Sequence, residues 1–112
     1  MTTREEALGI ALEMPGAYAD APFHDPNWIV VRRHGGKIFL CTFERRGQIW
    51  LNVKCRADWA QVLCASFESV VPAYHMNKRH WVSIILDGRM EDGEIRRMIC
   101  ESYDLVGKAR KS

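Results

Sequence analysis

The sequence predicts an α+β fold in which an antiparallel sheet packs against helices, with elements in the order α-β-β-β-α-β-α. Apolar residues recur at helical spacing near both ends of the chain, and β-branched and aromatic residues dominate its middle. Short turns separate the middle segments, and no internal repeat is present. Strands that follow one another through short turns favour an antiparallel sheet over parallel βαβ units.

The first element is a helix expected from about Thr3 to Glu13. Thr3 and Glu6 have the spacing of a capping box, and apolar residues follow at helical spacing. Pro15-Gly16 ends this helix. Residues 17–27 mix turn-forming residues with two aromatic ones, which is typical of an ordered connection rather than a flexible linker.

Three strands are expected next, over residues 28–33, 37–43 and 48–53. Gly35-Gly36 predicts a tight hairpin turn between the first two strands, and residues 44–47 join the second to the third. In the third strand, alternation leaves one face with Gln48, Trp50, Asn52 and Lys54. An indole among polar side chains predicts that this face is accessible.

A second helix is expected from about Asp58, which could act as its cap, to Glu68. Residues 70–72 are expected to be extended, because a residue before proline avoids the helical conformation. A polar loop follows over residues 73–80.

The last two elements are a strand and a helix. Residues 81–86 are apolar on both faces, which predicts a covered strand inside the sheet. Asp92 and Glu94 favour a helix start, and apolar residues continue at helical spacing to about Val106.

Size and composition indicate a single domain over residues 1–112. The chain is 47% hydrophobic and 27% charged, which excludes a disordered or low-complexity protein. No apolar run approaches the roughly 20 residues of a membrane span. Glu5 and Glu6 stand where a signal peptide has basic residues. We therefore expect a cytoplasmic protein with no membrane partner.

Cysteine spacing and charge distribution restrict the function further. The four cysteines form no C-x-x-C pair and have apolar neighbours, which is typical of reduced, buried thiols. The net charge of +2 is too small to require a nucleic-acid partner. However, residues 32–56 hold seven Lys or Arg and one Glu, whereas residues 1–31 hold one Arg and five acidic residues.

Three segments carry a family resemblance: His75-Met76-Asn77-Lys78-Arg79-His80-Trp81, then Leu86-Asp87-Gly88, then Ser102-Tyr103-Asp104-Leu105-Val106. Through them the chain resembles the MmcQ/YjbR family of small bacterial proteins over nearly its whole length. Pro15-Gly16 and the segment 52–55 have the family's spacing too. The resemblance implies a fold similar to frataxin/CyaY, sometimes described as a double wing, and a proposed role in DNA binding. It implies no established catalytic activity and no cofactor.

The leading hypothesis is therefore DNA binding without catalysis, through the basic hairpins and the 75–80 loop. Amide and guanidinium groups in that loop could read base edges, while Lys and His meet phosphates. A base could stack on Trp50 while Lys54 contacts the backbone. The candidate nucleic-acid-binding residues are Arg32, Arg33, Lys37, Arg45, Arg46, Trp50, Lys54, His75, Asn77, Lys78, Arg79 and His80.

Each of these candidates also has a structural interpretation. Asn77 could shape a loop bend, and charges at hairpin tips keep sheets soluble. Trp50 could be covered by a helix or by the N-terminal connection. A seven-residue strand spans roughly 23 Å, so successive hairpin tips point to opposite ends of a sheet. The DNA hypothesis depends on the cationic groups converging on one accessible side.

Two alternatives remain open. The chain could be a protein-interaction or small-ligand module whose 75–80 loop shapes a recess, which would be favoured if Asn77, His80 and Trp81 line a pocket. It could also handle metal as frataxin does, but His75 and His80 lack further ligands at metal-site spacing. We therefore predict no metal site.

Overall fold

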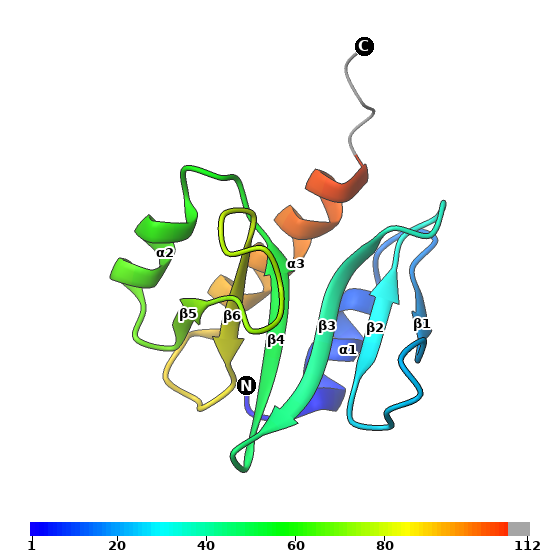
Figure 1. Ribbon diagram of the computed structural model, residues 1–112, viewed down its shortest axis with the longest axis horizontal. Coiled ribbons are helices and arrows are strands. Elements are labelled where there is room, and N and C mark those ends of the chain that lie inside the picture. The colour runs from blue at the N-terminus through cyan, green and yellow to red at the C-terminus, as the bar shows by residue number, and fades with distance from the viewer. Residues whose placement is uncertain (108–112) are drawn as a thin grey trace.

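Three helices and six strands make up residues 1–107, the part of the chain that the computed structural model describes (Figure 1). They are α1 (Arg4–Leu12), β1 (Tyr18–Asp20), β2 (Ile29–Arg32), β3 (Ile38–Arg45), β4 (Gln48–Lys54), α2 (Ala60–Ser66), β5 (Val70–Pro72), β6 (Trp81–Ile85) and α3 (Asp92–Gly107). The predicted α+β class is confirmed. The structure adds two short edge strands to the predicted order, and the connection 17–27 contains the first of them.

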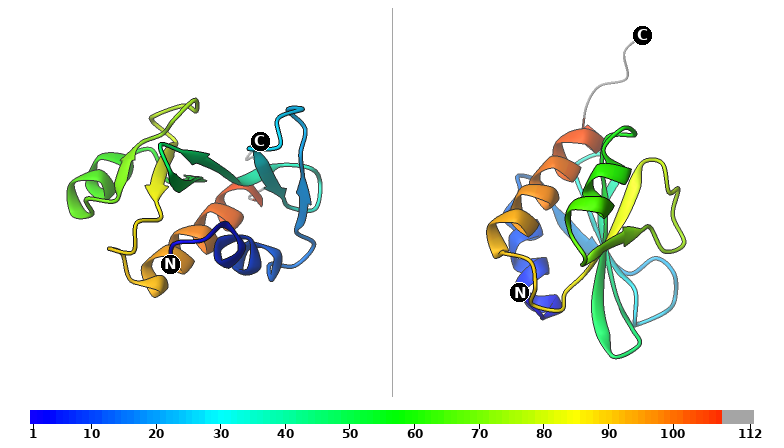
Figure 2. Two further views of the ribbon diagram at one scale, coloured as in Figure 1. Left: turned by 90° about the horizontal axis from the view of Figure 1, so that it is seen from below. Right: turned by 90° about the vertical axis from the view of Figure 1, so that its left-hand side faces the viewer.

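All neighbouring strands are antiparallel, in the order β1-β2-β3-β4-β6-β5. Helices α1 and α3 cover one face of the sheet, and α2 packs beside β5 (Figure 2). The core lies between these helices and the sheet, where Leu51 and Ile84 meet Ile95 and Ile99. Strand β6 has strands on both sides, as its two apolar faces predict.

Helix ends follow the capping rules only in part. Thr3 caps α1, and the reciprocal bonds between Thr3 and Glu6 complete the capping box. The expectation that Asp58 caps the second helix is wrong. Helix α2 begins at Ala60, its cap position is Trp59, and no side chain bonds there. A helix of seven residues gains most of its stability from Ala60 and Leu63, which are buried against the sheet.

A β-bulge interrupts β3. Val31 pairs with Leu40, but the next residue of β2, Arg32, pairs with Ile38. Phe39 is therefore an extra residue, and the alternation of side chains is reset across it. Phe39 and Leu40 are both fully buried in the helix-facing core, whereas Ile38 and Cys41 line the opposite face.

The bulge leaves polar backbone groups that α3 satisfies. The ladder between β3 and β4 ends at the pair Leu40 and Val53. Beyond it, the Ser102 hydroxyl donates to the Phe39 carbonyl and accepts from the backbone N–H of Lys54, at 2.8 Å for the second bond. One side chain of α3 therefore bridges two strands where they diverge.

Candidate functional site

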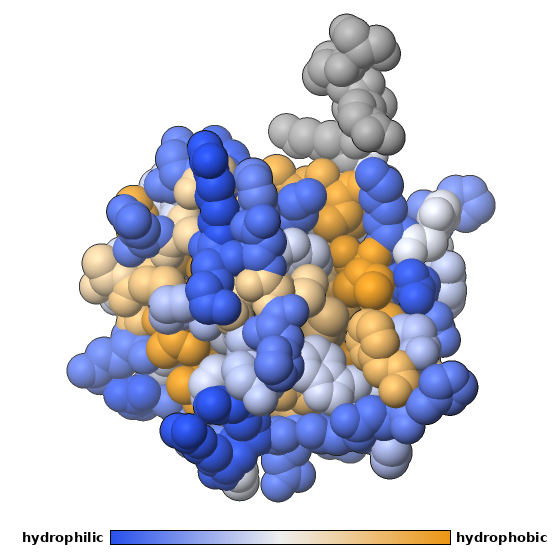
Figure 3. All heavy atoms as spheres, in the orientation of Figure 1, coloured by the Kyte–Doolittle hydropathy of each residue, from blue (hydrophilic) through white to orange (hydrophobic). Residues whose placement is uncertain are grey.

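Two loops rise from the face of the sheet opposite to α1 and α3: residues 21–28, between β1 and β2, and residues 73–80, between β5 and β6. Figure 2 (left) shows both loops on the side away from these helices. In Figure 3, which shows this face, hydrophobic surface gathers over β3 and is surrounded by hydrophilic side chains. We therefore place the candidate site between the two loops.

A buried polar network fixes the 73–80 loop to the sheet. The Ser83 hydroxyl donates to Asn52 Oδ1, and the Asn52 side-chain amide donates to the Tyr74 carbonyl at 2.8 Å. The backbone N–H of Tyr74 donates back to Ser83 Oγ at 2.9 Å. Asn52 and Ser83 are fully buried, so the loop is held by bonds that water does not reach.

Aromatic side chains cover the sheet beneath both loops. The indole of Trp28 stacks on Phe43 with ring centroids 4.1 Å apart, and Tyr74 packs on the same Phe43 from the other loop at 5.5 Å. Trp28 and His75 touch across the gap, with centroids 6.4 Å apart. Ring packing of this kind fixes the relative position of the two loops.

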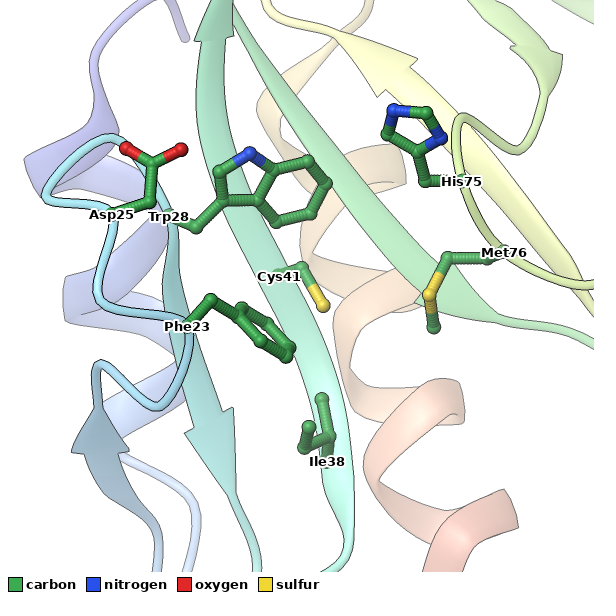
Figure 4. Close-up of a pocket in the computed structure, with 7 residues that line it drawn as sticks. All are labelled: Phe23, Asp25, Trp28, Ile38, Cys41, His75 and Met76. Carbon is green, nitrogen blue, oxygen red and sulfur yellow. The ribbon is translucent and has the colours of Figure 1, made fainter.

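Between the loops lies a hollow of about 320 Å³ (Figure 4). Its lining residues are Phe23, Asp25, Trp28, Ile38, Cys41, His75 and Met76. Figure 4 shows Phe23 and Trp28 on one side of Cys41, and His75 and Met76 on the other. An apolar lining with few polar groups is typical of small-molecule sites.

Each loop that forms the hollow holds a histidine in the left-handed backbone region. His24 has φ of 56° and His75 has φ of 62°. This conformation is uncommon for a residue with a side chain, and the surrounding structure must hold it. Both loops therefore have defined bends rather than relaxed ones.

The thiol of Cys41 lines the hollow as an apolar group. Burial raises the pKa of Cys41 to about 12, against a lesser opposing effect of Arg32. Burial likewise raises the pKa of Cys55 to about 11, with Glu101 and Cys64 adding to the effect. Both side chains therefore remain protonated at neutral pH and are poor nucleophiles.

The structure places the predicted hairpin cations in several different environments. Arg32 donates to Asp20 of β1 at 2.8 Å and to the Gly36 carbonyl in the hairpin turn at 2.7 Å, so its guanidinium is held between them. Arg33 donates to the Tyr103 carbonyl and lies 4.0 Å above the Tyr103 ring. Of the three candidate cations at this first hairpin, Arg32, Arg33 and Lys37, only Lys37 is exposed.

The second hairpin tip lies at the other end of the sheet. Strand pairing places Arg45 opposite Gln48, whereas Lys37 precedes the start of β3. Arg45 folds back over Trp50 and Tyr74, at 4.8 and 4.3 Å from their ring centroids. Arg46 is exposed in the turn. Arg45 therefore contacts the 73–80 loop through Tyr74, but its guanidinium is packed on aromatic rings. The expectation that the cations of both hairpins converge with the 75–80 loop on one accessible side is wrong for this tip.

The expectation of an accessible face on the third predicted strand is also wrong. Trp50 is 8% exposed beneath Arg45 and Tyr74, and Asn52 is fully buried in the network described above. The cover is the 73–80 loop, not a helix or the N-terminal connection. A base cannot stack on Trp50 unless this loop moves.

Within the 75–80 loop, Asn77 has a structural role. Its Oδ1 accepts the backbone N–H groups of Arg79 at 2.8 Å and His80 at 3.2 Å, and so forms the bend. Lys78, Arg79 and His80 are exposed. Asn77, His80 and Trp81 do not line the hollow, so the recess is shaped by His75 and Met76 instead.

Part of the predicted set is nevertheless brought together. Leu40 pairs with Val53, and Lys54 pairs with Trp81. The starts of β3 and β6 and the end of β4 therefore share one end of the sheet, which carries Lys37, Lys54, Lys78 and Arg79. Arg45 and Arg46 lie at the opposite end.

The sequence prediction missed the residues that line the hollow, apart from His75. Phe23 and Asp25 lie in the connection 17–27, and the sequence predicts Cys41 only as a buried thiol. The one local signal was the pair of aromatic residues flanking the Asp-Pro turn, Phe23 and Trp28. No spacing rule connects them with Met76, which is distant in the sequence.

No group of three or more His, Cys, Asp or Glu that could hold a metal occurs within residues 1–107. No helix in this part of the chain is long and apolar enough to cross a bilayer.

Comparison with known proteins identifies one family. The YjbR family model matches residues 12–105. The chain is 34% identical to the uncharacterized protein YbdF of Escherichia coli O157:H7, covering 91% of this chain and 82% of YbdF. It is 31% identical to the uncharacterized protein YyaQ of Bacillus subtilis (strain 168), covering 95% and 99%. These names carry no activity that could be transferred.

Solved structures show the same fold. A Deinococcus radiodurans protein, DR2400, with a domain named DUF419, matches with a TM-score of 0.88 and 26% identity, over 96% of this chain and 80% of that one. A Pseudomonas syringae protein matches with a TM-score of 0.81 and 23% identity, over 92% and 97%. The frataxin-like description stays a prediction. The chain itself belongs to the YjbR family, as its 75–81 segment predicts.

Proposed function

We propose that the protein is a non-enzymatic binding module that holds a small, flat, largely apolar organic molecule between the 21–28 and 73–80 loops. The hollow of about 320 Å³ on this face carries the proposal, because its volume and apolar lining are those of small-molecule sites. The relatives' names neither support nor oppose it.

The walls of the hollow support binding rather than mere packing. Each loop is fixed, one by the Asn52 and Ser83 network and the other by the stacking of Trp28 on Phe43. A site that is formed before its ligand arrives loses less conformational freedom on binding. Phe23 is 53% exposed at the rim, where a buried ligand would cover it.

Titration with indole, phenol and 2-naphthol, followed by ¹H–¹⁵N NMR, tests the proposal. We expect saturable shifts of the Cys41 and Met76 amides, lost in Trp28→Ala and kept in Trp59→Ala. Trp59 is a matched control because it is 39% exposed and lies outside the hollow. Circular dichroism confirms that both variants fold. Absence of saturable shifts with all three probes would reject the proposal.

A second candidate function is DNA binding, through fewer residues than the sequence predicts. Lys37, Lys54, Lys78 and Arg79 share one end of the sheet, and none of them forms an ion pair with another residue in the range 1–107. Cations without a protein partner are free to meet phosphates. This interpretation no longer uses Arg32, Arg33, Arg45 or Trp50.

Titration of a labelled duplex at low and moderate salt tests this candidate. Affinity should fall by about 0.9 log units per log unit of salt for each phosphate contacted. We expect Lys37→Ala and Lys78→Ala to weaken binding and to flatten this slope, whereas Arg46→Ala, at the opposite end of the sheet, should change neither. Absence of saturable binding at low salt would exclude the candidate.

We also propose a cytoplasmic location. It is supported by the cysteines, all four of which are unpaired in the structure of residues 1–107. Fractionation of cells that produce the protein tests it.

A further inference from the structure

We infer that the hollow selects a ligand that carries a quaternary or alkylated ammonium group. This inference rests on the proposed function and names the chemistry of the ligand. It is drawn from the arrangement of the aromatic rings, from the contacts that other aromatic rings make, and from the charges of the lining.

Two aromatic rings form a right-angled corner at the hollow. Phe23 and Trp28 have ring centroids 6.2 Å apart and an interplanar angle of 89°. The inner face of Trp28 is covered by Phe43, and Figure 4 shows the indole broadside from the side away from the helices. Aromatic faces that meet at an angle around an open space are the usual receptor for alkylammonium groups.

Other aromatic rings of this protein already hold cations. Arg33 lies over Tyr103, Arg45 over Trp50 and Tyr74, and Arg56 over Trp59 at 5.3 Å. No guanidinium or ammonium group of residues 1–107 lies over Trp28. Its π face is therefore left for a cation that the protein does not supply.

The charges of the residues that line the hollow also favour a positively charged ligand. Asp25 is the one carboxylate in the lining, and neither Lys nor Arg belongs to it within the described chain. Asp25 Oδ1 accepts the backbone N–H of Asn27 at 2.9 Å, while Oδ2 has no donor among residues 1–107. Figure 4 places Asp25 at the Trp28 end of the hollow, with His75 across from it. A cation over Trp28 would therefore have the carboxylate at its end of the hollow, while the imidazole of His75 lies 6.4 Å from the indole on the other side.

An anionic ligand would meet the opposite conditions. It would face both the carboxylate and the negative faces of the rings, and each of these repels it. Lys37 adjoins Ile38 in sequence, but its side chain is exposed and is not part of the lining. The hollow and the cationic end of the sheet are therefore separate sites for ligands of opposite charge.

Three probes of nearly equal shape separate charge from size. They are (4-hydroxyphenyl)trimethylammonium, its neutral isostere 4-tert-butylphenol, and 4-hydroxybenzenesulfonate, each titrated at pH 7 by NMR on the amides of Cys41 and Met76. We expect the ammonium probe to bind about five- to tenfold more tightly than the neutral isostere. The sulfonate should bind most weakly.

Variants assign the preference to named groups. Trp28→Leu should abolish the preference for the ammonium probe, and Trp28→Phe should restore part of it. Asp25→Asn should lower the preference by about two- to threefold, because an exposed carboxylate contributes modestly. Trp59→Leu is the control and should leave all three affinities unchanged.

The outcomes distinguish this inference from the proposed function. Equal binding of the ammonium and neutral probes, or tighter binding of the neutral or sulfonate probe, would overturn the inference and leave the proposed function standing. Failure of all three probes, together with failure of indole, would overturn both.

Discussion

Arg33 shows how a residue that resembles a DNA contact can be used within the fold. It lies at the C-terminal end of α3, where helix carbonyls lack partners and the helix dipole favours a positive charge. Its guanidinium donates to the Tyr103 carbonyl at 3.0 Å, covers the Tyr103 ring, and lies directly against Gly107. The charge pattern of the sequence could not distinguish this role from phosphate binding.

We expect Arg33→Ala to lower the free energy of unfolding by about 1–2 kcal/mol, since it removes a charged hydrogen bond and a cation over an aromatic ring. Lys37→Ala, four residues away and exposed, is the control and should change it by less than about 0.5 kcal/mol. Urea denaturation measures both. Equal effects of the two variants would contradict the assigned role.

The cysteines permit a second test at single residues. Burial raises the pKa of Cys41 to about 12 and that of Cys55 to about 11, whereas Cys64 and Cys100 are only half-buried. At pH 8, a disulfide reagent should therefore label at most two thiols quickly and all four after unfolding. Rapid labelling of four thiols in the native protein would contradict the burial of Cys41 and Cys55.

At the scale of elements, the junction of α3 with the sheet depends on one hydroxyl. Ser102→Ala leaves the Phe39 carbonyl and the Lys54 N–H without partners in a buried position. We expect a loss of about 2–3 kcal/mol in the free energy of unfolding. Ser66→Ala, which removes an exposed hydroxyl bonded within α2, should cost far less. Comparable losses in thermal denaturation of both variants would argue against a bridging role.

The stability of the fold depends on pH through Asp87, which lies in the turn after β6. Burial raises the pKa of Asp87, but bonds from the Arg89 side chain, the Ser69 hydroxyl and the Arg89 N–H outweigh it and lower the pKa to about 2. Because the pKa of Asp87 is lower in the folded than in the unfolded chain, the ionised carboxylate stabilises the fold at pH values above the unfolded pKa of about 4. This stabilisation is lost as the pH falls from about 4 to about 2.

We expect this contribution to be about 1 kcal/mol, because water screens the exposed Arg89. Asp87→Asn should therefore be less stable than the parent at pH 6, and the difference should shrink toward pH 2. Denaturation at a series of pH values measures it. Parallel pH profiles would show that Asp87 is not the titrating group.

Local sequence patterns predict the long helices and strands correctly, but not the short ones. The capping box at Thr3, the glycine turn at 35–36 and the apolar face of β4 with Leu51 and Val53 all appear where they are predicted. Strand β1 has three residues and is held by its pairing with β2, which is information that its own sequence does not contain. The start of α2 is set by packing of Ala60, so Asp58 was misassigned.

At the scale of the molecule, the sheet is covered by helices on one face and by loops on the other, and Asn52 holds the second cover. We expect Asn52→Leu to lower the free energy of unfolding by about 2–3 kcal/mol and to speed hydrogen exchange of the Tyr74 amide. Combined with Ser83→Ala, the losses should be less than additive, because both act in one network. Additive losses, or unchanged exchange at Tyr74, would contradict that network.

The candidate site was harder to predict than the fold for a physical reason. The face of each strand residue follows from alternation, but whether a face is open depends on a loop that crosses it. Trp50 and Asn52 were assigned to the correct face and the wrong environment, because the 73–80 loop covers them. The hollow joins residues from two loops and β3, which only the folded chain brings together.

The bulge at Phe39 has a consequence for relatives of different length. Since Phe39 is the extra residue of β3, removing it would leave Ile38 and Leu40 consecutive in a regular ladder, with Ile38 still opposite Arg32 and Leu40 still opposite Val31. Ile38 would keep its place in the wall of the hollow, and the helix-facing core would lose the Phe39 ring. A family member with a one-residue gap at position 39 should therefore keep this binding cavity and be less stable, because its core is smaller.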